Sequence, residues 1–171
     1  RQMCIRDRHG IWDNEQLSVY KIFYLRSHTE MRIQARFWAL DSWDDESGYL
    51  EIDGDVWWTR SRLYSRACTQ DDFEPFNGHV PNPWTGDDFQ HKCYFDIDVR
   101  KAHTAASTIV KFASNLNSNR FDESWAFSNV RISANSPPPV DLTTPMQVWV
   151  DLEDHEVNPA SASAWFATDS L

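Results

Sequence analysis

Hydrophobic and polar residues alternate along short segments through most of the first 135 residues, the pattern of strands with one buried face. In the segment 31–40, for example, Ile33 and Phe37 fall on one face while Arg32 and Arg36 fall on the other. The segments that predict strands are 17–25, 31–40, 49–53, 55–60, 93–100, 107–114 and 124–133. No amphipathic helical period lies between them, so we expect an all-β chain, folded as an antiparallel β-sandwich or jelly roll.

Turn and breaker residues divide the chain further. Asp53 and Gly54 separate two of the predicted strands, and this dipeptide predicts a tight hairpin. The segment 61–90 has no sustained period and several prolines and glycines, so we expect a long loop that crosses the sandwich. Three consecutive prolines then end a β-sandwich domain over residues 9–135. The remainder, 136–171, is expected to be a linker with an acidic tail or the start of a truncated next domain.

Aromatic content supports the β interpretation. The chain has nine Trp, ten Phe and five Tyr but only five Gly, and aromatic side chains fit the half-buried surface of a sheet. No apolar run reaches the roughly 18–20 residues that a membrane helix needs, so we expect no membrane insertion. The net charge of −10 disfavours nucleic acid as a partner and favours cations.

The N-terminal residues 1–8 fit neither the strand nor the helix period, and they lack the apolar stretch of a signal peptide. Because Met3–Arg8 reads like a translated sequencing adapter, we expect residues 1–8 to be a scar or a disordered terminus, with any signal peptide missing. Without this segment and its Cys4, Cys68 and Cys93 remain as an even pair, which predicts a disulfide in an extracellular chain. Two buried free thiols in a cytosolic protein are the alternative.

Three sequence blocks carry a resemblance. They read RFWALDSWDDE at 36–46, HTAASTIVKFASNL at 103–116 and DESWAFSNVRI at 122–132. Together they resemble a domain of large secreted and surface proteins of protists and marine bacteria, with DSWD-x-E and DESW-x-x-x-N-V motifs. The resemblance covers residues 9–135 and implies a jelly-roll β-sandwich of the galactose-binding or lectin-like type. Such a domain is usually an accessory module without catalytic activity.

Acidic residues gather where two predicted strands end or begin. Strand ends meet at the rims of a sandwich, and crowded carboxylates there repel one another unless a cation neutralises them. A hard ion with oxygen ligands suits such a cluster, so we predict a calcium site. The candidate ligands are Asp41, Asp44, Glu46, Asp122 and Glu123. Asp45 could as easily face solvent as join the site, while Trp43 and Trp125 are expected to anchor the two acidic loops. The alternative is that these acids only form turns and solvated charges.

Tryptophans offer candidate ligand platforms. Trp57 and Trp58 are adjacent on one predicted strand and must point to opposite faces, so one is expected in the core and the other outside it. Trp84 lies in the long loop, where it could stack on a sugar or fold back as a lid on the sandwich. We name Trp84 and Trp58 as candidate ligand-binding residues. The six histidines lack transition-metal spacing, and His103 is expected to order its turn.

These observations favour a non-catalytic, calcium-stabilised extracellular or cell-surface module for carbohydrate binding or adhesion, with glycans or other surface proteins as partners. A purely structural spacer of a surface or matrix protein is the alternative. A glycoside hydrolase is a third possibility, since paired acids about 5–10 Å apart can cleave glycosidic bonds. No nucleophile elbow, phosphate-binding loop or H-E-x-x-H motif is present in the sequence.

Overall fold

Strands form nearly all of the regular structure. The computed structural model describes residues 8–63, 66–135, 149–151 and 166–167. The strands are β1 (Arg8–Trp12), β2 (Ser18–Tyr24), β3 (Glu30–Asp41), β4 (Asp44–Ile52), β5 (Asp55–Leu63), β6 (Glu74–Pro75), β7 (Lys92–Ala102), β8 (Ser107–Ser114), β9 (Glu123–Asn135), β10 (Trp149–Asp151) and β11 (Phe166–Ala167). A short 3-10 helix, η2 (Cys68–Asp71), follows β5. No helix in these residues is long and apolar enough to span a membrane.

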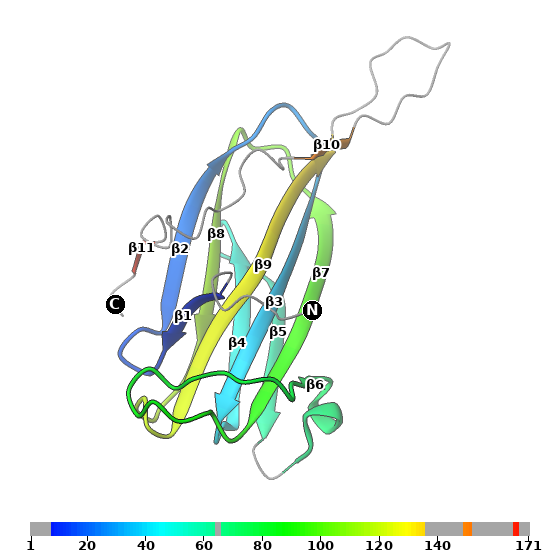
Figure 1. The fold of residues 1–171 in the computed structure, drawn as a ribbon. Helices are drawn as coiled ribbons and strands as arrows, with labels where there is room; N and C mark the ends of the chain where they lie inside the picture. The colour runs from blue at the N-terminus through cyan, green and yellow to red at the C-terminus, as the bar shows by residue number, and fades with distance from the viewer. Residues whose placement is uncertain (1–7, 64–65, 136–148, 152–165, 168–171) are drawn as a thin grey trace.

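Two antiparallel sheets pack face to face (Figure 1). Sheet A has the order β1-β9-β3-β7-β6, with β10 also paired to β9, and sheet B has the order β11-β2-β8-β4-β5. Eight of the strands have five or more residues. Numbered along the chain, these eight lie in the order 1-8-3-6 in sheet A and 2-7-4-5 in sheet B. This is the double-sheet arrangement of a jelly roll. The predicted all-β, antiparallel β-sandwich is therefore confirmed.

The main core lies between the two sheets and is rich in aromatic rings. Phe112 of sheet B stacks on Phe127 of sheet A, with ring centroids 4.2 Å apart. Phe37 packs beside Trp125, and its ring also covers Gly48 of β4. A Cβ on Gly48 would lie 2.5 Å from that ring, so only glycine allows the two sheets to approach here. Aromatic rings bury large apolar areas, so these contacts contribute strongly to the packing between the sheets.

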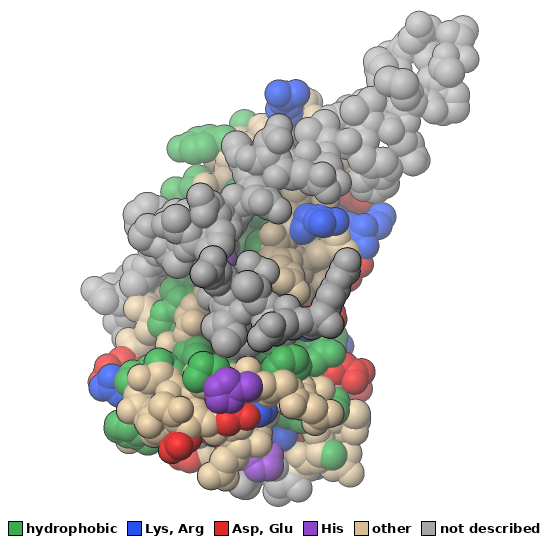
Figure 2. Space-filling view, viewed as in Figure 1, with side chains coloured by type: hydrophobic (Ala, Val, Ile, Leu, Met, Phe, Trp, Pro, Cys, Tyr) green, Lys and Arg blue, Asp and Glu red, His purple; other side chains and the backbone are tan. Residues whose placement is uncertain are grey.

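A second hydrophobic cluster lies on the outer face of sheet A, beneath the long loop. Its buried members are Trp38, Leu40, Val80, Phe89 and Ala126. Hydrophobic side chains gather over the lower part of the face in Figure 2, where this loop crosses the sheet. The polar outer face predicted for 31–40 therefore holds only for its first half. The second half of β3 is covered by the loop, a contact that no periodicity in the loop could reveal.

All seven predicted strands are present, with changes at their ends. Asp53 and Gly54 both have positive φ, 53° and 91°, and β4 pairs with β5 across them, so the predicted hairpin is confirmed. The segment 44–48, expected to belong to an acidic loop, instead begins β4. The alternation was obscured there by consecutive acidic residues. β1 was not predicted, because its five residues are too short to show a period.

The ends of the chain lie mostly outside the described residues. Arg8, the last residue of the proposed scar, begins β1 and pairs with Ser128. Beyond the prolines, β10 pairs with the end of β9 and β11 pairs with β2. The predictions for residues 1–7 and for the rest of 136–171 fall on residues that are not described.

Candidate metal centre

An acidic cluster lies at one end of the sandwich, between the two sheets. Asp44 and Glu46 come from β4 of sheet B, and Glu123 comes from the first position of β9 in sheet A. Carboxylate oxygens of these three residues lie within 4.8 Å of one another. They are three of the five predicted metal ligands, and they come from two sequence blocks about 80 residues apart. The tertiary fold therefore brings the two acidic motifs together.

Tryptophans on both sides hold the cluster in place. Trp43 is fully buried, and its Nε1 donates a hydrogen bond to the carbonyl of Ser124, 2.9 Å away on β9. Trp125 is also fully buried, and its Nε1 donates to the carbonyl of Gln16 at 2.9 Å. Trp43 directly precedes Asp44, and Trp125 lies two residues after Glu123, so each buried ring lies close in the chain to a residue of the cluster. Both rings are structural, as expected, and the hydrogen bond of Trp43 links the two acidic motifs.

Two of the three carboxylates are almost completely buried. Glu46 is 4% exposed and Glu123 is 1% exposed, whereas Asp44 is open to solvent. Glu46 accepts hydrogen bonds from the backbone N–H of Asp44 at 2.5 Å and from Nδ2 of Asn117 at 2.7 Å. Glu123 accepts one from the backbone N–H of Ser118 at 3.2 Å. Asn117 and Ser118 were not predicted, because a polar loop without a period contains no signal for such a contact.

The buried charges are poorly compensated. Burial and the charge of Glu46 raise the pKa of Glu123 to about 7, well above that of a free glutamate. Burial, together with the neighbouring Asp44, also raises the pKa of Glu46. In the described part of the chain, neither glutamate forms an ion pair with Lys, Arg or His. The pair can relieve its repulsion by holding a proton or by holding a cation.

Asp41 and Asp122 lie outside this cluster, so the prediction of a five-residue ligand set is wrong for these two. Asp41, at a φ of 63°, accepts hydrogen bonds from the backbone N–H groups of Gln90 and His91 at 2.9 and 3.4 Å. Its carboxylate thus ties the end of the long loop to β3, and burial raises its pKa. Asp122 is exposed and accepts a hydrogen bond from the hydroxyl of Ser42. Both carboxylates are occupied by backbone or hydroxyl donors of neighbouring loops.

The residues present fit a hard cation. All three side chains of the cluster offer carboxylate oxygens, and neither nitrogen nor sulfur lies among them, which suits calcium better than zinc or copper. Asp45, between Asp44 and Glu46 in the chain, is exposed, has a φ of 101° and lies outside the cluster. Asp44, Glu46 and Glu123 are the residues that would hold the ion.

The tryptophans named as ligand platforms differ in position. Trp58 is 6% exposed and packs between Phe37 and Phe95, so its ring cannot stack on a ligand and its assignment as a binding residue is wrong. Its neighbour Trp57 is half-buried, as the alternation of a strand requires. Trp84 is half-buried and packs against the second hydrophobic cluster, with the guanidinium of Arg120 5.7 Å from its ring centre. Trp84 therefore serves in part as a lid on the sandwich, which was the alternative prediction for this residue.

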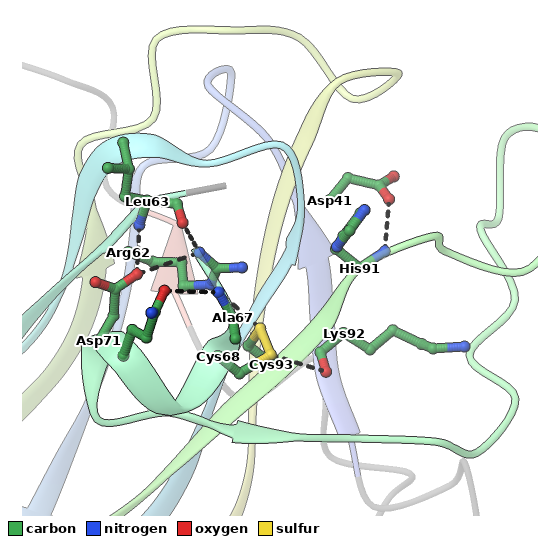
Figure 3. The surroundings of a disulfide bond; sticks show 10 residues. Asp41, Arg62, Leu63, Ala67, Cys68, Asp71, His91, Lys92 and Cys93 are labelled. Atoms are coloured by element: carbon green, nitrogen blue, oxygen red, sulfur yellow. Dashed lines mark hydrogen bonds and ion pairs between the residues drawn. A yellow bond between two sulfur atoms is a disulfide. The ribbon is translucent and has the colours of Figure 1, made fainter. Parts of the chain in front are cut away.

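The predicted disulfide joins Cys68 of η2 to Cys93 of β7, with Cα atoms 5.6 Å apart (Figure 3). Arg62 lies beside it, fully enclosed: its Nε donates to Sγ of Cys93, and its Nη1 lies 3.2 Å from the carboxylate of Asp71. Burial lowers the pKa of Arg62, which the charge of Asp71 partly restores. This ion pair was not predicted, because Asp71 belongs to a loop without a period. The ion pair between Arg62 and Asp71 joins the long loop to β5.

Comparisons with family models, with curated proteins and with solved structures found no match to this chain. The resemblance to the surface-protein domain therefore stays a prediction, and the site is interpreted from its own geometry.

Proposed function

We propose that the chain is a non-catalytic, calcium-stabilised module of an extracellular or cell-surface protein, and that it serves carbohydrate binding or adhesion. One observation carries this proposal: Glu46 and Glu123 are buried and face each other from the two sheets without a basic partner among the described residues. A calcium ion there would neutralise the pair and link sheet A to sheet B. The disulfide Cys68–Cys93 supports an extracellular location, because such bonds persist in oxidising compartments.

The binding part of the proposal rests on the loops at the acidic end. Trp84, from the long loop, and Arg120, from the loop before β9, lie against each other there and are both partly exposed. An aromatic ring beside a guanidinium can offer an apolar face and hydrogen-bond donors to a sugar. Calcium would favour binding indirectly, by holding the loop before β9 through Glu123.

A structural spacer is the second candidate. The burial of Trp58 and the packing of Trp84 on the second hydrophobic cluster favour it, since both rings then serve stability. A glycoside hydrolase is less well supported. A catalytic carboxylate pair must leave room for a sugar between its members, whereas the carboxylates of Glu46 and Glu123 are close together and enclosed.

A thermal melt tests the metal. Calcium at about 100 times its Kd should stabilise the wild type by about 2.7 kcal/mol, which is about 5–10 °C in Tm for a domain of this size. Glu123→Gln removes a ligand and the repulsion together, so it should lose the calcium shift while melting higher than the wild type in EDTA. Asp45→Asn is the matched control and should keep the shift. If the wild type melts at the same temperature with calcium and with EDTA, the site is wrong.

A glycan array, probed with and without EDTA, separates the two candidate functions. The carbohydrate-binding module is supported if the wild type binds a glycan in calcium but not in EDTA. The Trp84→Ala variant should then fail to bind that glycan even in calcium. If the protein shows the calcium-dependent shift in Tm but binds no glycan on the array, the structural spacer is favoured.

A further inference from the structure

Two histidines and an aspartate form a hydrogen-bonded chain at the end of the sandwich opposite the acidic cluster. His28 lies in the loop before β3, His103 in the loop after β7 and Asp53 in the β4–β5 hairpin. Nε2 of His28 is 2.7 Å from Nδ1 of His103, and Nε2 of His103 is 3.0 Å from Oδ2 of Asp53. At the other end, Nδ1 of His28 is 2.6 Å from the carbonyl oxygen of Arg26. Three loops far apart in sequence meet in this chain.

The two imidazole rings meet edge to edge. The two ring planes differ by 16°. The ring centroids are 4.9 Å apart, whereas Nε2 of His28 and Nδ1 of His103 are 2.7 Å apart. The difference is about the width of one imidazole ring. The facing nitrogens therefore lie close to the line that joins the ring centres, within nearly coplanar rings. The lone pair of an imidazole nitrogen lies in the ring plane, so this is the geometry of an N–H···N hydrogen bond.

Both ends of the chain require a proton on the histidine side. The carbonyl of Arg26 can only accept, so Nδ1 of His28 carries a hydrogen. Burial alone would raise the pKa of Asp53, but hydrogen bonds from Ile109, His103 and Thr108 outweigh it and lower the pKa below its ordinary value. The carboxylate is thus ionised and accepts the hydrogen on Nε2 of His103.

The proton count of the pair follows from these assignments. Two neutral imidazoles have two N–H hydrogens, and both are already committed to Arg26 and Asp53. The facing nitrogens would then be two bare lone pairs 2.7 Å apart, which repel. One more proton between them makes a hydrogen bond, whereas two more would direct two N–H groups at each other. The geometry therefore corresponds to a single shared proton.

We propose that His28 and His103 share one proton, so that the pair carries one positive charge, is neutralised by Asp53, and acts as a pH-sensitive clamp across three loops. His28 is 3% exposed, which keeps water from substituting for the N–H···N bond. The role of His103 is thus wider than the ordering of its own turn. The clamp is independent of the acidic cluster and of the proposed calcium ion.

Other charged groups near the clamp act elsewhere. Asp55 follows the hairpin and is exposed, and the side chain of Arg26 is exposed while only its carbonyl meets His28. Lys101, two residues before His103, donates to the carbonyl of Val56 and lies over the ring of Trp57. Glu30, two residues after His28, is half-buried at the start of β3. Among the residues that the structure describes, Asp53 is the charged side chain that is hydrogen-bonded to the pair.

The clamp should weaken on both sides of its optimum. A second proton at low pH breaks the N–H···N bond by placing hydrogens on both facing nitrogens. Loss of the shared proton at high pH removes the bond and the attraction to Asp53. The contribution to stability is therefore greatest where the pair holds one proton, and it falls toward acid and toward base.

Nitrogen-15 NMR of histidine-labelled full-length chain tests the proposal directly. At the pH of greatest stability we expect Nδ1 of His28 and Nε2 of His103 to be protonated, and the two facing nitrogens to share a proton and show coupling across the hydrogen bond. The pair should gain and lose protons together as the pH changes. Bare signals from both facing nitrogens throughout the folded range, or two histidines that titrate independently, would overturn it.

A pH series of thermal melts gives the second readout, in a Glu123→Gln background that reduces the contribution of the acidic cluster. The Tm of the parent should pass through a maximum that His28→Gln and Asp53→Asn both flatten. His79→Gln is the control, because His79 is exposed beside Asp88 and away from the clamp. If His79→Gln flattens the maximum as much as His28→Gln does, the clamp is wrong. The NMR result on the unsubstituted chain decides the proposal even if a variant fails to fold.

Discussion

Arg62 and Asp71 show what one buried ion pair does in this protein. The side chain of Arg62 is 2% exposed and that of Asp71 is 8% exposed. Asp71 also accepts a hydrogen bond from the backbone N–H of Leu63 at 2.9 Å, while Arg62 donates to the carbonyl of Leu63. The two side chains thus satisfy the end of β5 and neutralise each other. A buried pair need not add net stability, but removal of one partner leaves an uncompensated charge.

Asp71→Asn should therefore destabilise the protein strongly. The substitution keeps the shape of the side chain but leaves the guanidinium of Arg62 without a counter-charge, and we expect a loss of about 3–5 kcal/mol in the free energy of unfolding. Urea denaturation measures it. Asp72→Asn is the matched control, since Asp72 is exposed and lies 4.0 Å from Arg60, and it should change stability by about 0.5 kcal/mol or less. Equal effects of the two substitutions would contradict this account.

At the scale of elements, the start of β4 decides where the acidic residues point. The register between β4 and β5 shifts between Asp44 and Glu46, and the intervening Asp45 has a φ of 101°. An extra residue of this kind bends a strand and re-aims the side chains beside it. Glu46 consequently points between the sheets while Asp45 points to solvent. The bulge is the reason that three consecutive acids have different environments.

The long loop depends on its disulfide. Cys68 and Cys93 are 25 residues apart, and a cross-link of that span should stabilise the fold by about 3.5 kcal/mol through the lost entropy of the unfolded chain. Cys68→Ala with Cys93→Ala should lower the free energy of unfolding by roughly that amount in a denaturant titration. A reducing agent should have a similar effect on the wild type and none on the double variant. Equal stability of the oxidised and reduced wild type would contradict the prediction.

At the scale of the whole molecule, the sandwich carries a group of interacting polar side chains at each end. The acidic cluster lies where β3 ends and β9 begins, and the histidine clamp lies where β3 begins. The first contains side chains from both sheets, on β4 and β9, and the second contains side chains from three loops. By our proposals, the stability of the domain should respond to calcium through the acidic end and to pH through both ends.

The acidic end should make the calcium-free protein less stable as the pH rises. The pKa of Glu123 is about 7 in the folded chain and about 4.5 in the unfolded chain, so the folded state binds more protons in between. This contribution is fully present below about pH 4.5 and is lost as the pH rises through about 7, at a slope of at most about 1.4 kcal/mol per pH unit. Urea unfolding in EDTA from pH 5 to pH 8 should show the decline. Glu123→Gln should show less of it, and an equal decline in both proteins would refute the assignment.

Much of the fold followed from local patterns. Alternation in segments such as 31–40 and 93–100 identified the strands, and the Asp53–Gly54 dipeptide identified a hairpin whose two positive φ angles the turn requires. The acidic motifs and the cysteine pair named the residues of the candidate site and of the disulfide. The predicted set of ligands was only partly right. Asp41 and Asp44 are close together in the sequence, and the sequence could not show that only Asp44 belongs to the cluster.

The sequence by itself determined the strands, the turn and the chemical character of each loop, because these depend on neighbours within a few residues. Only the tertiary structure decided which carboxylates share a space, that Trp58 is enclosed, and that Asp53 meets His103. Those contacts depend on strand register and on how loops cross, and they join positions far apart in the sequence, such as Asp53 and His103, which are 50 residues apart. A side chain's burial and partners set its pKa and its ligands, so the acidic motifs became a defined cluster of Asp44, Glu46 and Glu123 only after folding.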